Sequence, residues 1–376
     1  MQQPYGWGVC GLGKQRPPGS FFDMGDSGGT LWSMRTKSRQ PWWSYLPDAE
    51  LLEMRLKDLH VSIEGTWIQG CMKELNGELK RRGLVQAHAW ISDEWFSPDT
   101  TPGIAVPFYL AHPRLARLER KMFKEVEGGT KRQCMQILRH EAGHIIQHAY
   151  ALHRRRKWQE MFGRSSSPYP DSYRPNPNSR DFVQHLPRWY AQSHPDEDFA
   201  ETFAVWLTPR ASWRTKYAEW PGALEKLEFV DELMQSISGM KAGLTRRMEV
   251  DPVGRLNKTL ADHYERKLAH YSIDTDTRYD RDLQRIFSNE PRHARSKPAS
   301  AFLRKNRIQI REGAWRVSGA YHFALEHTID QLISRARALK LRAPGTESEL
   351  RKAMVRLIHN KVAHQLHTSR RQWFAV

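Results

Sequence analysis

Residues 140–148 read HEAGHIIQH and lie where several helix signals of the chain coincide. Thr130 follows two glycines and is an expected N-cap, and apolar residues then recur at helical spacing at positions 138, 142, 145, 149 and 152. We therefore predict a long amphipathic helix over residues 131–158. Gly143 in its middle costs about 1 kcal/mol relative to Ala, a cost that is tolerable where another group must come close, as beside a metal.

His140 and His144 stand four residues apart, so a helix presents both imidazoles on one face. Glu141 is rotated by about 100° from His140 and could reach a water on an ion held there. This is the H-E-x-x-H arrangement of zinc hydrolases, with two histidine ligands and a glutamate general base. The alternative is a chance match in a chain with 17 histidines, and the capped helical context counts against it.

A third ligand is needed, because a catalytic zinc usually takes three protein ligands and leaves a position for water. His148 is excluded, since it lies about 12 Å from His140 along the helix axis, and three such side chains meet one ion only in a nearly straight line. The pattern HExxHxxGxxH is also excluded, because Gln147 and Tyr150 stand at its Gly and last His positions. We interpret His148 as a polar flank of the helix near substrate.

The third ligand is expected from a second predicted helix over residues 194–207, whose first turns contain DEDFAE. Its Glu197 and Glu201 share one face, so one carboxylate can bind the metal while the other accepts the ring N–H of a histidine ligand. The alternative is a solvated acidic helix start, which explains Asp196 and Asp198 better than Glu201. In a purely structural zinc site, Asp198 or His194 are conceivable fourth ligands.

The bulk composition fits a folded protein of two or three domains, with 376 residues, 39% hydrophobic and 27% charged. Three scattered cysteines and the absence of a secretory signal or a membrane-spanning run predict a cytoplasmic protein without membrane association. The net charge of +17 raises nucleic acid or acidic substrates as partners. Because the charge extends from Lys14 to Arg371, we favour a solvated basic surface.

The pattern along the chain predicts the α+β class and three regions. Residues 1–44 form an irregular arm packed through Trp32, Trp42 and Trp43, residues 45–250 a domain with the site, and residues 251–376 a mostly helical region. Strands are predicted at 59–64, 85–92 and 103–110, and Pro107 favours an edge position for the last. A helix is predicted over 66–83, and the Pro- and Ser-rich residues 164–180 form a loop.

The HEAGH and EDFAE elements together resemble those of gluzincin metalloproteases, in particular the catalytic domain of anthrax lethal factor. PYPDSYRPNPNSRDF, followed by HLPRWYAQSHPDEDFAETFAVWL, more closely resembles a bacterial family described only as putative zinc-binding metallopeptidases, from about residue 45 onward. The resemblance implies that Glu197 is the third zinc ligand, that Glu201 supports a histidine ligand and that Tyr190 stabilises the oxyanion. Members that begin with a cysteine-rich zinc ribbon differ from this chain, which has none.

Together these observations predict a zincin-like core with Zn²⁺ on His140, His144 and Glu197, and Glu141 as general base for peptide hydrolysis. The expected partner is a peptide or protein substrate, including acidic ones, bound as an extended strand beside residues 104–110. Two alternatives stay open. One is a protease recruited to nucleic acid by its basic surface, and the other is a non-catalytic binding protein stabilised by zinc.

Overall fold

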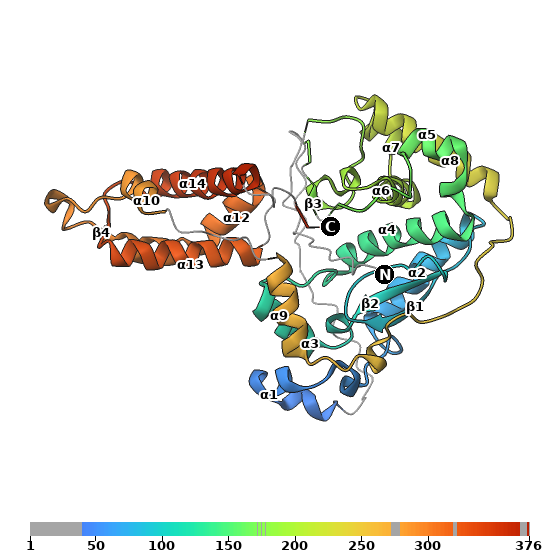
Figure 1. Ribbon diagram of the computed structural model, residues 1–376, viewed down its shortest axis with the longest axis horizontal. Coiled ribbons are helices and arrows are strands. Elements are labelled where there is room, and N and C mark those ends of the chain that lie inside the picture. The colour runs from blue at the N-terminus through green and yellow to red at the C-terminus, as the bar shows by residue number, and fades with distance from the viewer. Residues whose placement is uncertain are drawn as a thin grey trace, which may run out of the picture.

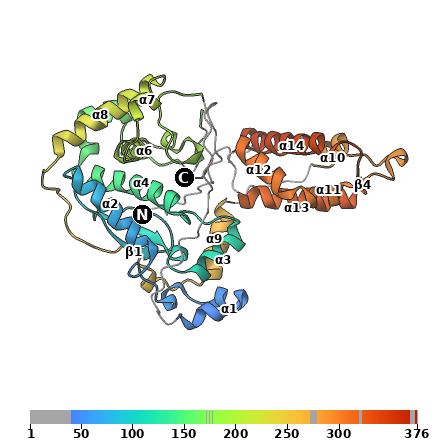
Figure 2. The same cartoon turned by 180° about the vertical axis from the view of Figure 1, so that it is seen from behind.

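The computed structural model describes residues 40–170, 172–173, 175–176, 178–271, 279–318, 322–368 and 374–375. Helices dominate, with short two-stranded sheets, so the α+β expectation is confirmed at the level of mixed secondary structure. Figure 1 shows a rounded lobe and a helical unit, α10–α14, that projects from it, and Figure 2 shows the same arrangement from behind. No helix in the described ranges is long and apolar enough to cross a membrane.

The helices of the rounded lobe are α1 Asp48–Glu53, α2 Trp67–Arg81, α3 Pro113–Phe123, α4 Lys131–Ala149, α5 Arg156–Phe162, α6 Pro195–Leu207, α7 Trp213–Lys216, α8 Pro221–Ile237 and α9 Leu260–Tyr271. Those of the projecting unit are α10 Asp280–Ile286, α11 Ala299–Lys305, α12 Arg307–Ser318, α13 His322–Ala338 and α14 Glu347–Thr368. The strands are β1 His88–Ser92, β2 Gly103–Pro107, β3 Ser172–Tyr173, β4 Lys297–Pro298, β5 Arg342–Ala343 and β6 Phe374–Ala375.

Strands β1 and β2 pair in parallel, with His88 opposite Gly103 and Ser92 opposite Pro107. Both predicted strands are therefore present, although each is shorter than its apolar pattern. Strand β2 is an edge strand of this two-stranded sheet, as Pro107 predicted. Its outer edge is partly covered by the β1–β2 connection, because the Ala105 N–H donates to the Phe96 carbonyl at 2.8 Å and all five β2 residues are buried. Binding of an extended peptide beside residues 104–110 stays a prediction.

The helix predicted over 66–83 is confirmed as α2, whereas the strand predicted at 59–64 is wrong. His60 adopts a left-handed backbone with φ of 47°, which interrupts the alternation directly after a 3-10 turn over Leu56–Leu59. A six-residue alternation without a partner strand is too short to overcome such a turn.

The predicted helix around the HEAGH motif is confirmed as α4, and Thr130 caps it by accepting a hydrogen bond from the Gln133 N–H at 3.2 Å. It ends at Ala149 rather than near residue 158, because Ala151 turns into the left-handed region with φ of 50° before α5 begins. The apolar stripe from Leu138 to Leu152 is buried as predicted.

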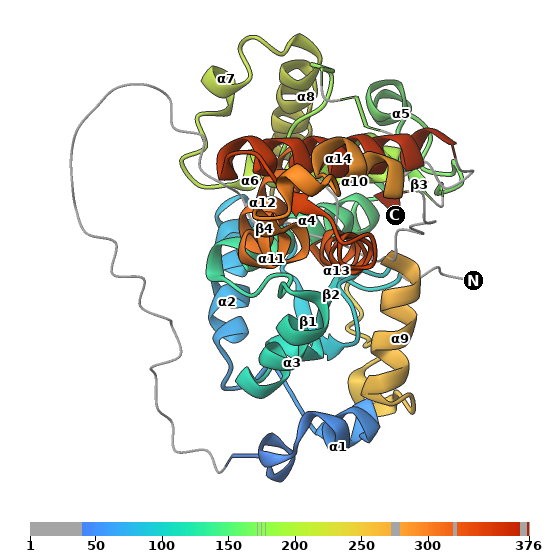
Figure 3. The ribbon, with the colours of Figure 1, turned by 90° about the vertical axis from the view of Figure 1, so that its left-hand side faces the viewer.

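Helix α4 forms the middle layer of the rounded lobe. Figures 1 and 3 show α6 on one side of it and the β1–β2 pair with α2 on the other. A buried ion pair fixes the α2 side, where the Arg139 guanidinium donates two hydrogen bonds of 2.8 and 2.7 Å to Glu78. Because both sides are covered, α4 is buried almost all round, its histidines included.

Two clusters of buried apolar side chains form the core, one with members from Trp43 to Tyr264 and one with members from Tyr279 to Ile358. Of the predicted aromatic anchors of the N-terminal arm, Trp43 is buried and Trp42 is 65% exposed. Trp32 and the arm up to residue 39 lie outside the described residues.

A buried cluster of charges joins α9 to α3 within the first core. The Lys267 ammonium lies 3.0 Å from Glu119 and 3.8 Å from Glu94, and these carboxylates raise its pKa although burial alone would lower it. Burial raises the pKa of Glu94 to about 7, partly offset by Lys267. Lys267 is therefore the cation that neutralises these carboxylates away from water.

We predict that Lys267→Met lowers the free energy of unfolding by roughly 3–5 kcal/mol, because it leaves buried carboxylates without their counter-charge. Urea-induced unfolding of the full chain measures this loss. Lys241→Met, a substitution of an exposed lysine, serves as the control and is expected to change stability by less than about 0.5 kcal/mol. Equal stability of the two variants would contradict the prediction.

Candidate metal centre

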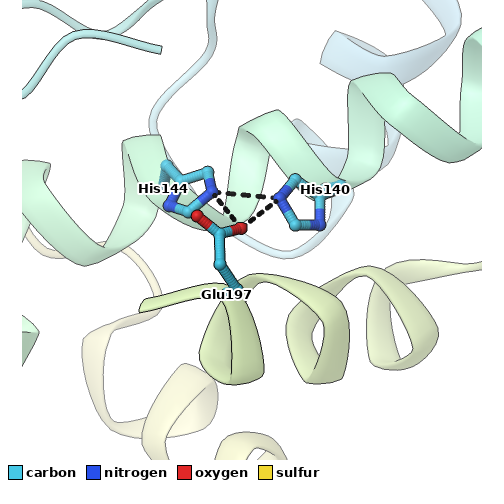
Figure 4. A group of neighbouring side chains, drawn as sticks. All are labelled: His140, His144 and Glu197. Atoms are coloured by element: carbon cyan, nitrogen blue, oxygen red, sulfur yellow. Dashed lines mark hydrogen bonds and ion pairs between the residues drawn. The ribbon is translucent and has the colours of Figure 1, made fainter. Parts of the chain in front are cut away.

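Helices α4 and α6 bring three potential metal-binding side chains together, as Figure 4 shows. His140 Nε2 and His144 Nε2 are 3.0 Å apart, and Glu197 Oε2 lies 3.1 and 3.2 Å from them. Ligands bound tetrahedrally to zinc at about 2.0–2.1 Å would be about 3.3 Å apart, so this triangle has the size of a coordination shell. All three side chains are buried.

Glu201 orients the first histidine. Its Oε1 accepts a hydrogen bond from His140 Nδ1 at 2.8 Å, and its Oε2 accepts one from the Leu186 N–H at 2.7 Å. With the proton on Nδ1, the lone pair of His140 Nε2 faces Glu197 and His144. The structure thus places Glu197 at the imidazole nitrogens and Glu201 behind the ring.

The charges of the cluster favour a bound cation. Burial alone would raise the pKa of Glu197, but His144 and His140 outweigh it and keep the pKa below its usual value. Burial alone would lower the pKa of His140, but Glu197 and Glu201 raise it to about 10. The two buried carboxylates therefore need positive charge beside them. Protonated imidazoles can provide it, and a divalent cation can provide it when the imidazoles are neutral.

Gly143 sets the distance between the two helices. A Cβ at this position would lie 2.7 Å from the Ala200 Cα, closer than real Cβ contacts, and 3.1 Å from its carbonyl oxygen, which is also tight. The sequence indicated that a neighbour comes close to Gly143, and the structure identifies it as the backbone of α6. This close approach brings Glu197, at the start of α6, within reach of α4.

The start of α6 is fixed by its own residues. Pro195 occupies the first turn, and His194 caps the helix by accepting a hydrogen bond from the Asp196 N–H at 3.2 Å. Asp198 points elsewhere, to Lys226 of α8 at 2.6 Å. Burial raises the pKa of Asp198 to about 7, with Lys226 opposing this effect. His194 and Asp198 therefore do not add a fourth ligand to the triad.

The triad faces a pocket of about 1130 Å³. Glu141, His144, Glu197 and His148 line it, so His148 is near the site without joining the triad. The Oε1 atom of Glu141 is buried, and no described residue donates a hydrogen bond to it. Burial raises the pKa of Glu141, although His140 and His144 lower it.

Tyr190 lies next to His140 but not in this pocket wall. Its ring packs against the His140 ring at a centroid distance of 5.9 Å and an angle of 64°, and it is buried. The pocket wall carries Tyr169 instead, whose hydroxyl donates to Glu197 Oε1 at 2.9 Å. Tyr169 was not predicted from the sequence, because it stands in a Pro- and Ser-rich segment without a helical or strand period.

Other parts of the pocket wall come from segments distant in sequence. Two of these segments are residues 93–99 and 251–258. In the first, the Ser97 hydroxyl donates to the Glu141 backbone carbonyl at 3.2 Å, and in the second, Lys258 pairs with Asp93. No local motif links these segments to the HEAGH helix, so the sequence contained no signal for them. The wall carries both acidic and basic side chains.

Two histidines and a glutamate lie around one point and could hold a metal ion, and a second glutamate, Glu141, lines the adjacent pocket. Comparison with known proteins agrees. The model of a family described as "putative zinc-binding metallo-peptidase" matches residues 116–233, a stretch that includes α4 and α6. No curated protein and no solved structure matches the chain. The comparisons give no support to the resemblance to lethal factor or to a bacterial origin.

We predict that Gly143→Ala lowers the free energy of unfolding by roughly 1–3 kcal/mol, because the added methyl group must push α4 away from α6. Gly70→Ala is a matched control at an exposed position of α2, where an added Cβ meets nothing within 4 Å. This substitution should stabilise the protein by up to about 1 kcal/mol. Urea unfolding measures both. A neutral or stabilising Gly143→Ala would show that the helix spacing is not constrained there.

Proposed function

We propose that the protein is a zinc-dependent peptidase with its active site on α4 and α6. The observation that carries the proposal is the triangle of His140 Nε2, His144 Nε2 and Glu197 Oε2 beside the unpartnered Oε1 of Glu141. A site helix packed between a small sheet and a second helix also supports a zincin-like core. The family match over residues 116–233 agrees with zinc and with peptide hydrolysis.

In this proposal His140, His144 and Glu197 hold zinc, which when bound supplies a Lewis acid that polarises the scissile carbonyl and the attacking water. Glu141 takes the proton of that water through Oε1 and later gives it to the leaving amine. Glu201 keeps the proton of His140 on Nδ1 throughout, so that Nε2 stays available to the metal.

The oxyanion-donor role of Tyr190 rests on the resemblance alone. Its buried ring packs against His140 but does not line the pocket, so this role would require Tyr190 to move toward the substrate. For the substrate we propose a peptide or protein chain. A pocket of about 1130 Å³ with both acidic and basic walls can receive several residues of such a chain.

The alternative of a zinc-stabilised binding protein needs a closed site with four protein ligands. Among the described residues the metal-competent group has three members, and His194 and Asp198 are held by other partners. The fourth coordination position of a bound metal would therefore be left for a water on the pocket side. This favours a catalytic metal over a purely structural one.

We predict that Glu141→Gln retains zinc but loses peptide cleavage by about 10²–10⁴-fold, because the amide cannot accept the proton. Zinc content is measured by elemental analysis, and cleavage with a random-sequence peptide library read by mass spectrometry. Glu160→Gln, an exposed substitution on α5, is the control and should cleave like the wild type.

Cleavage by Glu141→Gln at the wild-type rate would remove Glu141 as the base. Wild-type protein that binds no stoichiometric zinc under metal-replete conditions would overturn the whole proposal.

We further propose nucleic-acid binding as a second function, located on the projecting unit. Residues 279–368 contain 18 Lys and Arg against 8 Asp and Glu, whereas residues 40–271 contain 33 against 30. The positive charge of the described residues is therefore concentrated in α10–α14. Such a concentration is the electrostatic footprint of a polyanion site.

The far end of this unit combines exposed cations from separate segments. Strands β4 and β5 pair there, at the end that Figure 1 shows farthest from the rounded lobe. Arg295, Lys297 and Lys340 are exposed, and no ion pair engages them among the described residues. The large apolar side chains that are exposed in the described chain lie elsewhere, which favours contact with duplex phosphates over base stacking.

We predict that the triple variant Arg295→Gln, Lys297→Gln, Lys340→Gln weakens binding to a random-sequence DNA duplex. The slope of log affinity against log salt should fall by about 2–3, because each lost phosphate contact removes about 0.9. Fluorescence anisotropy between 50 and 200 mM salt measures it. Lys73→Gln, Lys157→Gln, Lys241→Gln removes the same charge from exposed sites of the rounded lobe.

Equal weakening by the two triple variants would show diffuse attraction and overturn the site. Absence of duplex binding at 50 mM salt would overturn the function. Binding to anionic lipid vesicles in place of DNA would assign the surface to a membrane instead.

A further inference from the structure

Residues Ser165, Ser167 and Tyr169 contact the first turn of α6 one after another. The Ser165 hydroxyl donates to Asp196 Oδ2 at 3.0 Å. The Ser167 carbonyl lies 2.9 Å from His194 Nε2. Residues 165–166 lie in a turn in which the Ser167 N–H donates to the Arg164 carbonyl at 3.0 Å. The contacts with α6 and its cap are made by the Ser165 side chain, the Ser167 carbonyl and the Tyr169 side chain. We call residues 165–169 the brace.

His194 connects the brace to the helix cap. Its Nδ1 accepts a hydrogen bond from the Asp196 N–H, so Nε2 carries the proton and donates to the Ser167 carbonyl. Its ring also stacks on Tyr169, with centroids 3.7 Å apart and an angle of 16° between the planes. The side chain of His194 is 1% exposed, so the cap, the ring stack and the hydrogen bond fix a single orientation.

The last contact of the brace gives the two oxygens of Glu197 different partners. Tyr169 donates to Oε1 at 2.9 Å, while Oε2 lies 3.1 Å from His140 Nε2 and 3.2 Å from His144 Nε2. Rotation of the carboxylate about its terminal bond would exchange the two oxygens or turn both toward the histidines. The hydroxyl of Tyr169 opposes that rotation.

We propose that Tyr169 is a positioning residue, which restricts Glu197 to binding the metal through Oε2 alone. This inference rests on the proposed function, because it takes Glu197 as a zinc ligand. A carboxylate that already has one oxygen occupied binds the metal through the other and leaves the pocket side of the metal free for water. The brace therefore contributes to metal affinity as well as to the pocket wall.

The experiment measures zinc affinity by competition with a chromophoric chelator in the full chain. Tyr169→Phe keeps the ring stack on His194 and removes only the hydroxyl. We expect its zinc dissociation constant to rise roughly 10–100-fold, the range for residues that support metal ligands. Tyr150→Phe is the matched control. It also removes a phenol hydroxyl that forms a hydrogen bond, here to the Val85 N–H at 3.1 Å, and should leave zinc affinity unchanged.

Cleavage of the peptide library at saturating zinc separates positioning from a direct action on the substrate. A positioning role predicts that Tyr169→Phe regains most of the wild-type rate once zinc saturates it. A persistent loss of kcat at saturating zinc, or a zinc affinity equal to that of the wild type, would overturn the inference and leave the peptidase proposal intact. Wild-type protein without zinc binding would overturn both, so the two failures are distinguishable.

Discussion

The contact between α4 and α6 at Gly143 is the constraint on which the candidate site depends. A side chain at this point would collide with the Ala200 backbone, so the helices approach closely only because position 143 has no Cβ. The same approach brings Glu197 to the two imidazoles and Glu201 to the back of His140. The spacing of the helices, more than any single hydrogen bond, therefore creates the metal-competent triangle.

Burial of this triangle imposes the second constraint. Removing two carboxylates and two imidazoles from water is costly unless each charge has a partner. Glu201 meets this condition with His140 and the Leu186 N–H, and Glu197 meets it with Tyr169 on one oxygen. Among the described residues, the other oxygen of Glu197 lies beside the two histidines, and a cation at their centre would satisfy all three groups at once.

Local patterns were sufficient to predict the helix with the HEAGH motif, its cap at Thr130 and the shared face of His140 and His144, because these depend on residues within a few turns. The acidic turn at 196–201 gave a set of candidates, but spacing alone did not choose among them. The position of Tyr169, the Phe96 bridge and the turn at His60 depend on contacts or backbone states without a periodic signal. They became visible only in the structure.

The two glutamates that flank the triad show how the surroundings assign different roles to the same side chain. Both oxygens of Glu201 accept hydrogen bonds, so this carboxylate is committed to orienting His140. Glu141 is equally buried and lines the pocket, and within the described part of the chain its Oε1 accepts no hydrogen bond. Because burial raises the pKa of Glu141, an incoming proton is stabilised there. The rotation of about 100° between neighbouring helix positions thus separates His140, a proposed metal ligand, from Glu141, the proposed proton acceptor.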